Sequence, residues 1–151
     1  MNETYAELAT VSRHGFIESR HFGSLIALDK NGKAVIEVGP VDSAILPRSS
    51  TKPIQALACL RAGAPLRDAQ LAIACGSHTG EPEHVDVVDS ILALAGLSRD
   101  ALQCPPSKPE NDDAYRALIK SGNEPERIHM NCSGKHAAML LACTLNKWPI
   151  E

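Results

Sequence analysis

Residues 46–63 read LPRSSTKPIQALACLRAG, and at this stretch the sequence changes from strand-like to helix-like patterning. Apolar residues recur at helical spacing in its second half, and Gly63 suits a helix C-cap. The pattern predicts a helix that begins at Ser50 with Ser49 as its N-cap. Pro53 is compatible with this start, because N–H groups in the first turn of a helix have no intrahelical partner.

Two polar residues of this stretch, Ser49 and Lys52, admit either a structural or a catalytic interpretation. A serine hydroxyl at a helix N-terminus lies among free backbone N–H groups and the positive end of the helix dipole, which favour developing negative charge. Lys52 lies one turn further on, where a lysine whose pKa is lowered by burial or nearby positive charge can remove the hydroxyl proton. In the structural alternative, Ser49 caps the helix and Lys52 is solvated, and Ser-x-x-Lys alone favours that alternative.

Residues 6–38, which precede this stretch, carry strand patterns. Asn31-Gly32 lies between two β-rich runs, and an Asn-Gly pair tolerates the positive φ angles of a tight hairpin turn. Residues 34–38 alternate as a strand with one better-buried face does. A further strand pair is expected before them, turning at Gly15.

Helical patterns dominate the chain after residue 63. Helices are expected at 66–75, 83–95, 112–121 and 133–146. The last of these is apolar on nearly every side, which is typical of a helix buried within a larger core. Strands followed by helices predict an α+β fold or a sandwich-type α/β arrangement.

Composition limits the classes of function. The chain has 151 residues, 44% of them hydrophobic, which is enough for one globular domain or half of a larger one. Its net charge of −3 is spread along the chain and no apolar run approaches the ~20 residues of a membrane span, so neither nucleic acid nor membrane is expected as a partner. The start, MNETYAEL, lacks the features of a signal peptide. Five cysteines, an odd number, fit a reduced, cytoplasmic protein better than a disulfide framework.

Two later stretches contain several polar residues at the ends of predicted helices. Residues 75–84, CGSHTGEPEH, place Ser77 between two predicted helices, where a helix stop followed by an N-cap is the simpler explanation. Residues 131–143, NCSGKHAAMLLAC, open an apolar helix with the polar residues Cys132, Ser133, Lys135 and His136. Capping by Ser133 explains part of this cluster. A metal or catalytic site is the alternative, with Cys132 as a soft ligand.

Four stretches together resemble one family. RHGFIESRHFG, LPRSSTKPIQAL, CGSHTGEPEHV and NCSGKHAAMLLA look like the successive motifs of the thermolabile, rhizobial-type L-asparaginases, the asparaginase II family. The resemblance runs from about residue 8 to the end of the chain, and four ordered motifs are far more specific than any one alone. It implies an α/β fold similar to those of serine β-lactamases and glutaminases, in which a Ser-x-x-Lys motif carries the nucleophile.

The resemblance also implies roles for individual residues. Ser49 matches the nucleophile, Lys52 its partner base, and Ser77 the serine of a second Ser–Lys pair. Arg48 and His136 match residues of the substrate pocket for L-asparagine. Two residues, Cys132 and Lys135, match ligands of a zinc ion thought to organise substrate binding. The family further implies a homodimer.

The sequence stops at NKWPIE, where family members continue for roughly as many residues again. Residues 1–151 are therefore expected to be the N-terminal half of an asparaginase II-type catalytic domain, without a second zinc-binding cysteine and the lysine that pairs with Ser77. The leading expectation is an L-asparaginase that releases ammonia and L-aspartate by Ser/Lys catalysis. The alternatives are another serine amidase, of the glutaminase or penicillin-recognising type, and an inactive fragment or metal-binding module.

Overall fold

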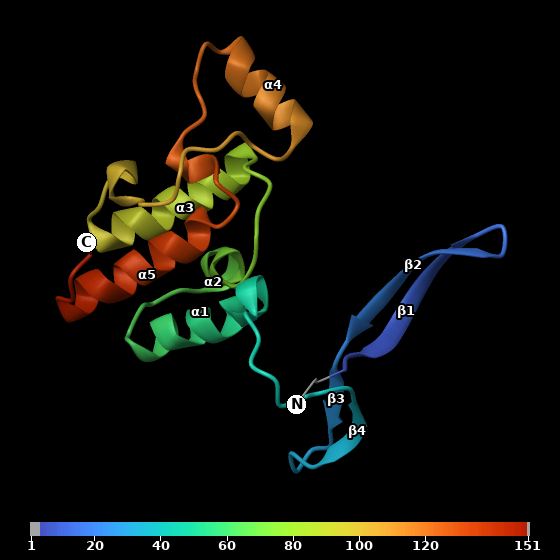
Figure 1. The fold of residues 1–151 in the computed structure, drawn as a ribbon. Coiled ribbons are helices and arrows are strands. Elements are labelled where there is room, and N and C mark those ends of the chain that lie inside the picture. Colours follow the sequence, from blue (N-terminus) through green and yellow to red (C-terminus); the bar gives the residue numbers. More distant parts are fainter. Residues whose placement is uncertain (1–3, 151) are drawn as a thin grey trace. The chain divides into compact units, whose positions relative to one another are not determined.

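A computed structural model describes residues 4–150 of the chain. The chain divides between Leu46 and Pro47 into two compact parts, with β-hairpins in the first and helices in the second (Figure 1). This arrangement confirms the predicted mixed α+β class, with strands first and helices afterwards. Within residues 4–150, no helix is both long enough and apolar enough to cross a membrane.

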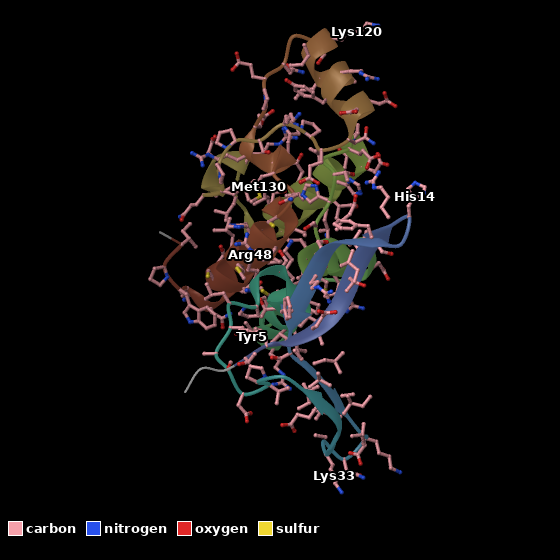
Figure 2. The ribbon with its side chains drawn as sticks, turned by 45° about the vertical axis from the view of Figure 1, so that its right-hand side comes forward. Tyr5, His14, Lys33, Arg48, Lys120 and Met130 are labelled. Atoms are coloured by element: carbon pink, nitrogen blue, oxygen red, sulfur yellow. The ribbon has the colours of Figure 1, made fainter. Side chains whose placement is uncertain are left out.

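The first part contains two antiparallel strand pairs: β1 (Ala6–Arg13) with β2 (Phe16–Gly23), and β3 (Leu25–Leu28) with β4 (Ala34–Val38). β1 and β2 are joined by His14 and Gly15, whose φ angles of 47° and 82° suit a two-residue hairpin turn. The predicted turn at Gly15 is therefore confirmed. Figure 2 shows His14 at the tip of this hairpin and Lys33 at the tip of the next.

The turn between β3 and β4 differs from the tight Asn-Gly turn that the sequence predicts. Gly32 alone has a positive φ angle, 81°, and its N–H donates to the carbonyl of Asp29 at 3.0 Å. The Asp29 carboxylate accepts from the backbone N–H groups of Asn31 and Lys33, at 2.8 and 2.9 Å. Because Asp29 organises the loop with its side chain, the connection is longer than a two-residue turn.

The large apolar side chains of these hairpins are exposed, as is every residue of β4. The better-buried face predicted for residues 34–38 is therefore absent from the described structure. Each sheet has only two strands, and a two-stranded ribbon cannot bury a face by itself.

The helical part follows the predicted order. Its helices are α1 (Lys52–Arg61), α2 (Asp68–Cys75), α3 (Pro82–Ala95), α4 (Asp112–Lys120) and α5 (Ser133–Asn146). Three 3₁₀ turns accompany them: η1 (Arg48–Thr51), η2 (Arg99–Ala101) and η3 (Arg127–His129). The C-cap of α1 is Ala62, one residue before the predicted Gly63. Gly63 follows it with φ of 92°, and its N–H donates to the Leu60 carbonyl at 3.0 Å.

The core of this part is organised around α5, which contacts α1, α2 and α3 (Figure 1). Seven of its residues are buried: Ser133, Gly134, Ala137, Ala138, Leu140, Leu141 and Ala142. The prediction of a largely buried helix at 133–146 is thus confirmed for its first ten residues, whereas Leu145 near its end is 50% exposed. Small residues on α5 let the neighbouring helices approach it closely.

One contact in this core predicts a large effect of a small substitution. A Cβ atom at Gly134 would lie 2.8 Å from the Ile73 carbonyl oxygen and 2.9 Å from two of its side-chain carbons. Gly134→Ala is therefore expected to lower the free energy of unfolding by about 1–3 kcal/mol, although alanine favours a helix by about 1 kcal/mol. Urea denaturation followed by far-UV circular dichroism measures the change.

The control for that experiment is Gly76→Ala. A Cβ atom there meets its nearest neighbour, the Ala72 carbonyl oxygen, at 3.6 Å, an ordinary contact distance. The control should change stability by less than about 0.5 kcal/mol. Equal effects of the two substitutions would contradict the close α2–α5 packing.

Candidate active site

A buried lysine and an exposed serine meet where α1 and the segment after α2 come together. Lys52 Nζ donates a hydrogen bond to Ser77 Oγ at 2.7 Å. Lys52 is only 3% exposed although it is the first residue of α1, whereas Ser77 is exposed. The solvated lysine of the structural alternative is therefore wrong.

Ser49 lies in η1, the 3₁₀ turn that leads into α1, and its side chain does not cap either helix. The predicted helix start at Ser50 is therefore two residues early, since α1 begins at Lys52. The hydroxyls of Ser50 and Thr51 donate to the carbonyls of Pro47 and Arg48, at 2.6 and 2.9 Å. Among the described residues, Ser49 has the one hydroxyl of this turn without a hydrogen bond.

Arg48 has a backbone conformation that is unusual for a residue with a side chain. Its φ angle is +48°, in the left-handed region, and its side chain is exposed at the start of α1 (Figure 2). Non-glycine residues in this region cost of order 1 kcal/mol or more, and such strain is common at functional sites. The strain falls directly beside Ser49.

His78 and Ser133 form a buried polar contact that connects the segment after α2 to the start of α5. His78 Nε2 lies 2.8 Å from Ser133 Oγ, and the two residues are 4% and 0% exposed. Burial lowers the pKa of His78 to about 4, with the positive charges of His84 and Lys52 acting in the same direction and Glu110 opposing them. His78 is therefore neutral near pH 7. The prediction that Ser133 caps α5 is wrong, because Cys132 is the N-cap and the Ser133 hydroxyl points inward.

The first turn of α5 carries Cys132, Lys135 and His136, all partly buried. Burial lowers the pKa of His136, and the positive charges of Lys135 and Lys52 add to this effect. His136 also lines a cavity of about 220 Å³ together with Gln103, Met139 and other residues, and that cavity does not include Ser49, Lys52 or Ser77. His136 is thus electrostatically coupled to Lys52 without sharing its hydrogen bond.

The donors available for zinc are incomplete in the described part of the chain. Cys132 offers a thiolate and Lys135 an amine, one turn apart. Within residues 4–150, no group of three or more His, Cys, Asp or Glu side chains is placed to hold a metal ion. All five cysteines have free thiols. Because structural zinc sites use four ligands, these two residues do not form such a site by themselves.

Further polar contacts hold the segment that carries Ser77. The Asn111 side chain donates to the Glu81 carboxylate at 3.0 Å, and the Asn111 backbone N–H donates to the Thr79 carbonyl at 3.0 Å. The Thr79 hydroxyl donates a short hydrogen bond to the other Glu81 oxygen. The sequence gives no signal for these partners, because residues 79–81 and Asn111 are thirty positions apart.

The structure therefore brings together Lys52 and Ser77, with Ser49 one turn before Lys52 and His136 nearby. Within residues 4–150, it gives Arg48 no side-chain hydrogen bond or ion pair with the other predicted residues, and it gives Cys132 and Lys135 no shared metal geometry. His78 lies next to Ser77 in the stretch CGSHTGEPEHV, but its residue type and spacing alone gave it no functional role.

Free and lysine-bonded serines beside the first turn of a helix are the groups that serine-dependent hydrolases use for nucleophilic catalysis. The chain belongs to the L-asparaginase II family, whose model matches residues 9–151. This membership implies amidohydrolase activity and confirms the resemblance seen in the four sequence motifs. No curated protein matches the chain significantly.

Proposed function

We propose that the chain is an L-asparaginase that hydrolyses the side-chain amide of L-asparagine to L-aspartate and ammonia. The observation that carries this proposal is the hydrogen bond of 2.7 Å between the buried Lys52 and Ser77, within residues matched by the L-asparaginase II family. Burying a lysine amino group costs free energy of folding, and an amine next to a serine hydroxyl can transfer a proton.

In the proposed mechanism, Ser49 is the nucleophile. Its oxygen adds to the amide carbon while its proton passes to Lys52, which acts as a neutral amine. The Lys52 ammonium formed in this step then protonates the leaving nitrogen, and the tetrahedral intermediate expels ammonia. Water then hydrolyses the ester formed on Ser49 and releases L-aspartate. Lys52 makes a hydrogen bond with Ser77 and follows Ser49 by one turn, which supports its role as the base for the Ser49 hydroxyl.

Substrate recognition is proposed for Arg48 and His136. The Arg48 guanidinium is exposed beside Ser49, and guanidinium groups bind carboxylates through two parallel hydrogen bonds. Lys135 adds positive charge near His136. Cationic side chains such as Arg48 and Lys135 favour a substrate that carries a carboxylate, as L-asparagine does.

The finer fold assignment is also a proposal. N-terminal hairpins followed by a helical part, with Ser-x-x-Lys at the entrance to α1, are compatible with the arrangement of serine β-lactamases and glutaminases. An experimental structure would test this assignment, and a topology in which the hairpins pair into an unrelated sheet would contradict it.

Ammonia release from L-asparagine and from L-glutamine tests the proposed reaction. We expect the chain to release ammonia from L-asparagine with a kcat/KM at least about tenfold above that for L-glutamine, since a site built for one side-chain length rejects another by about 1–3 kcal/mol. A preference for L-glutamine would favour a glutaminase instead. No ammonia from either amide would overturn the proposed activity of this chain.

Zinc remains part of the proposal through Cys132 and Lys135. These two residues would supply two of four ligands, so we expect weak zinc binding by the chain or binding that needs ligands from elsewhere. A bound ion would hold the first turn of α5 in place and supply a positive charge near the substrate. Metal analysis after equilibrium dialysis measures the stoichiometry, and tight zinc binding that survives Cys132→Ala would contradict the ligand assignment.

A further inference from the structure

The position of the Ser77 hydroxyl depends on the residues beside it. Within residues 4–150, the hydrogen bond from Lys52 is the one hydrogen bond that Ser77 makes. On one side, α2 ends at Cys75 and Gly76 is extended. On the other side lies His78, which is anchored at several points. Ser77 therefore lies in a short segment between the end of α2 and His78.

His78 is held by three hydrogen bonds of its own. Its backbone N–H donates to the Asn131 carbonyl at 3.1 Å, and its ring Nε2 lies 2.8 Å from Ser133 Oγ. The Gly80 N–H donates to ring Nδ1 at 3.1 Å. Asn131 lies just before α5 and Ser133 is its first residue, so His78 connects the Ser77 segment to the start of α5.

These contacts allow only one protonation state of the ring. The Ser133 hydroxyl donates its proton to the Ile128 carbonyl at 2.7 Å, so His78 Nε2 must be the donor to Ser133. The Gly80 backbone N–H can only donate, so Nδ1 must carry a lone pair. The ring is thus neutral, with a proton on Nε2, and neither ring nitrogen lacks a partner.

We propose that His78 is a positioning residue that holds the Ser77 hydroxyl against Lys52 by anchoring the Ser77 segment to Ser133 and Gly80. The kinetic part of this inference rests on the proposed asparaginase function. The geometric part, that Ser77 loses Lys52 when His78 is removed, stands without it. A displacement of about 1 Å in a catalytic group costs on the order of 100-fold in rate.

The test compares His78→Ala with His129→Ala. His129 is a matched control because it is also buried, at 6% exposed, and its Nδ1 also accepts a backbone N–H, that of Glu126 at 2.9 Å. Within residues 4–150, it makes no hydrogen bond with Ser77 or Lys52. Two conservative variants separate the contacts of His78. In His78→Gln the side-chain amide can still donate to Ser133, and in His78→Asn the side-chain oxygen can still accept from the Gly80 N–H.

The first readout is independent of any substrate. The NMR signal of the Lys52 amino group is measured in the nitrogen-labelled chain. The Ser77→Ala variant shows how far this signal shifts when Lys52 loses its hydrogen-bond partner. We expect His78→Ala to move this signal in the same way and His129→Ala to leave it in place. If His78→Ala does not fold, the same comparison with the glutamine and asparagine variants decides. An unmoved Lys52 signal in folded His78 variants would overturn the proposal.

The second readout is the split between kcat and KM for L-asparagine. We expect His78→Ala to lower kcat about 10–100-fold with KM within about threefold, and His78→Gln to recover part of the loss. His129→Ala should stay within about twofold in both constants at equal folded fraction. If His78→Ala and His129→Ala lowered kcat equally, His78 would have only a structural role. A wild-type chain without activity would overturn the proposed function, while the NMR comparison would still decide the role of His78.

Discussion

Replacing Ser49 with alanine should lower the turnover of L-asparagine by roughly four orders of magnitude or more, because the variant lacks the oxygen that attacks the amide. Lys52→Met should cost nearly as much, since it keeps the side-chain stem and deletes the amine. The double variant should be little worse than either single one, because residues that act as a unit lose activity together. Single-turnover and steady-state assays of ammonia release measure these effects.

Ser50→Ala provides the control for the nucleophile. The Ser50 hydroxyl already donates to the Pro47 carbonyl at 2.6 Å, so its loss should change turnover less than about twofold and affect mainly the η1 turn. A severe loss in Ser50→Ala with a mild one in Ser49→Ala would show that the wrong hydroxyl had been assigned. Full activity of both Ser49→Ala and Lys52→Met would leave neither residue a catalytic role.

Lowering the pH from 7 to 4 should reduce the free energy of unfolding of the helical part by roughly 3 kcal/mol through His78 alone. The pKa of His78 falls from an ordinary 6.5 to about 4 in the folded chain, chiefly because burial disfavours the charged ring. Between these values the unfolded chain binds a proton that the folded chain does not. The stability present above pH 6.5 is therefore lost progressively as the pH falls towards 4.

Several charged groups around His78 modify the effect of burial on its pKa. His84, Lys52 and His129 lower its pKa, whereas Glu110 raises it. The pKa of His129 is lowered as well, chiefly by burial, so His129 adds to the loss of stability in the same direction. Urea denaturation at several pH values, followed by circular dichroism at the helix band, measures the slope.

His78→Gln supplies the control for the pH experiment, because glutamine does not titrate. The variant should be less stable than the wild type at pH 7 but should lose less stability between pH 6.5 and 4. The free energy of unfolding of each protein is plotted against pH, and its slope gives the number of protons taken up on unfolding. The two slopes should differ by nearly one proton. Parallel slopes for the two proteins would show that His78 is charged or exposed in the folded chain.

Local patterns were sufficient to predict most of the elements. The turn at Gly15 and the glycine after α1 were predictable because positive φ angles favour glycine. α5 was predicted with its observed bounds, since small and apolar residues run without interruption from Ala137 to Cys143. The start of α1 was less accurate, because a 3₁₀ turn and an α-helix share nearly the same local pattern over one turn.

The amino-acid sequence by itself determined the order of strands and helices, the polar stretches around Ser49, Ser77 and Cys132, and the family to which the chain belongs. The tertiary structure decided which of these residues meet. Lys52 pairs with Ser77, twenty-five positions away, because α1 and α2 pack together and bury the lysine stem beside the end of α2. Ser133 faces His78 across fifty-five positions instead of capping its own helix. Local propensity acts over about one helical turn, whereas these contacts depend on packing between distant segments, which no short sequence pattern records.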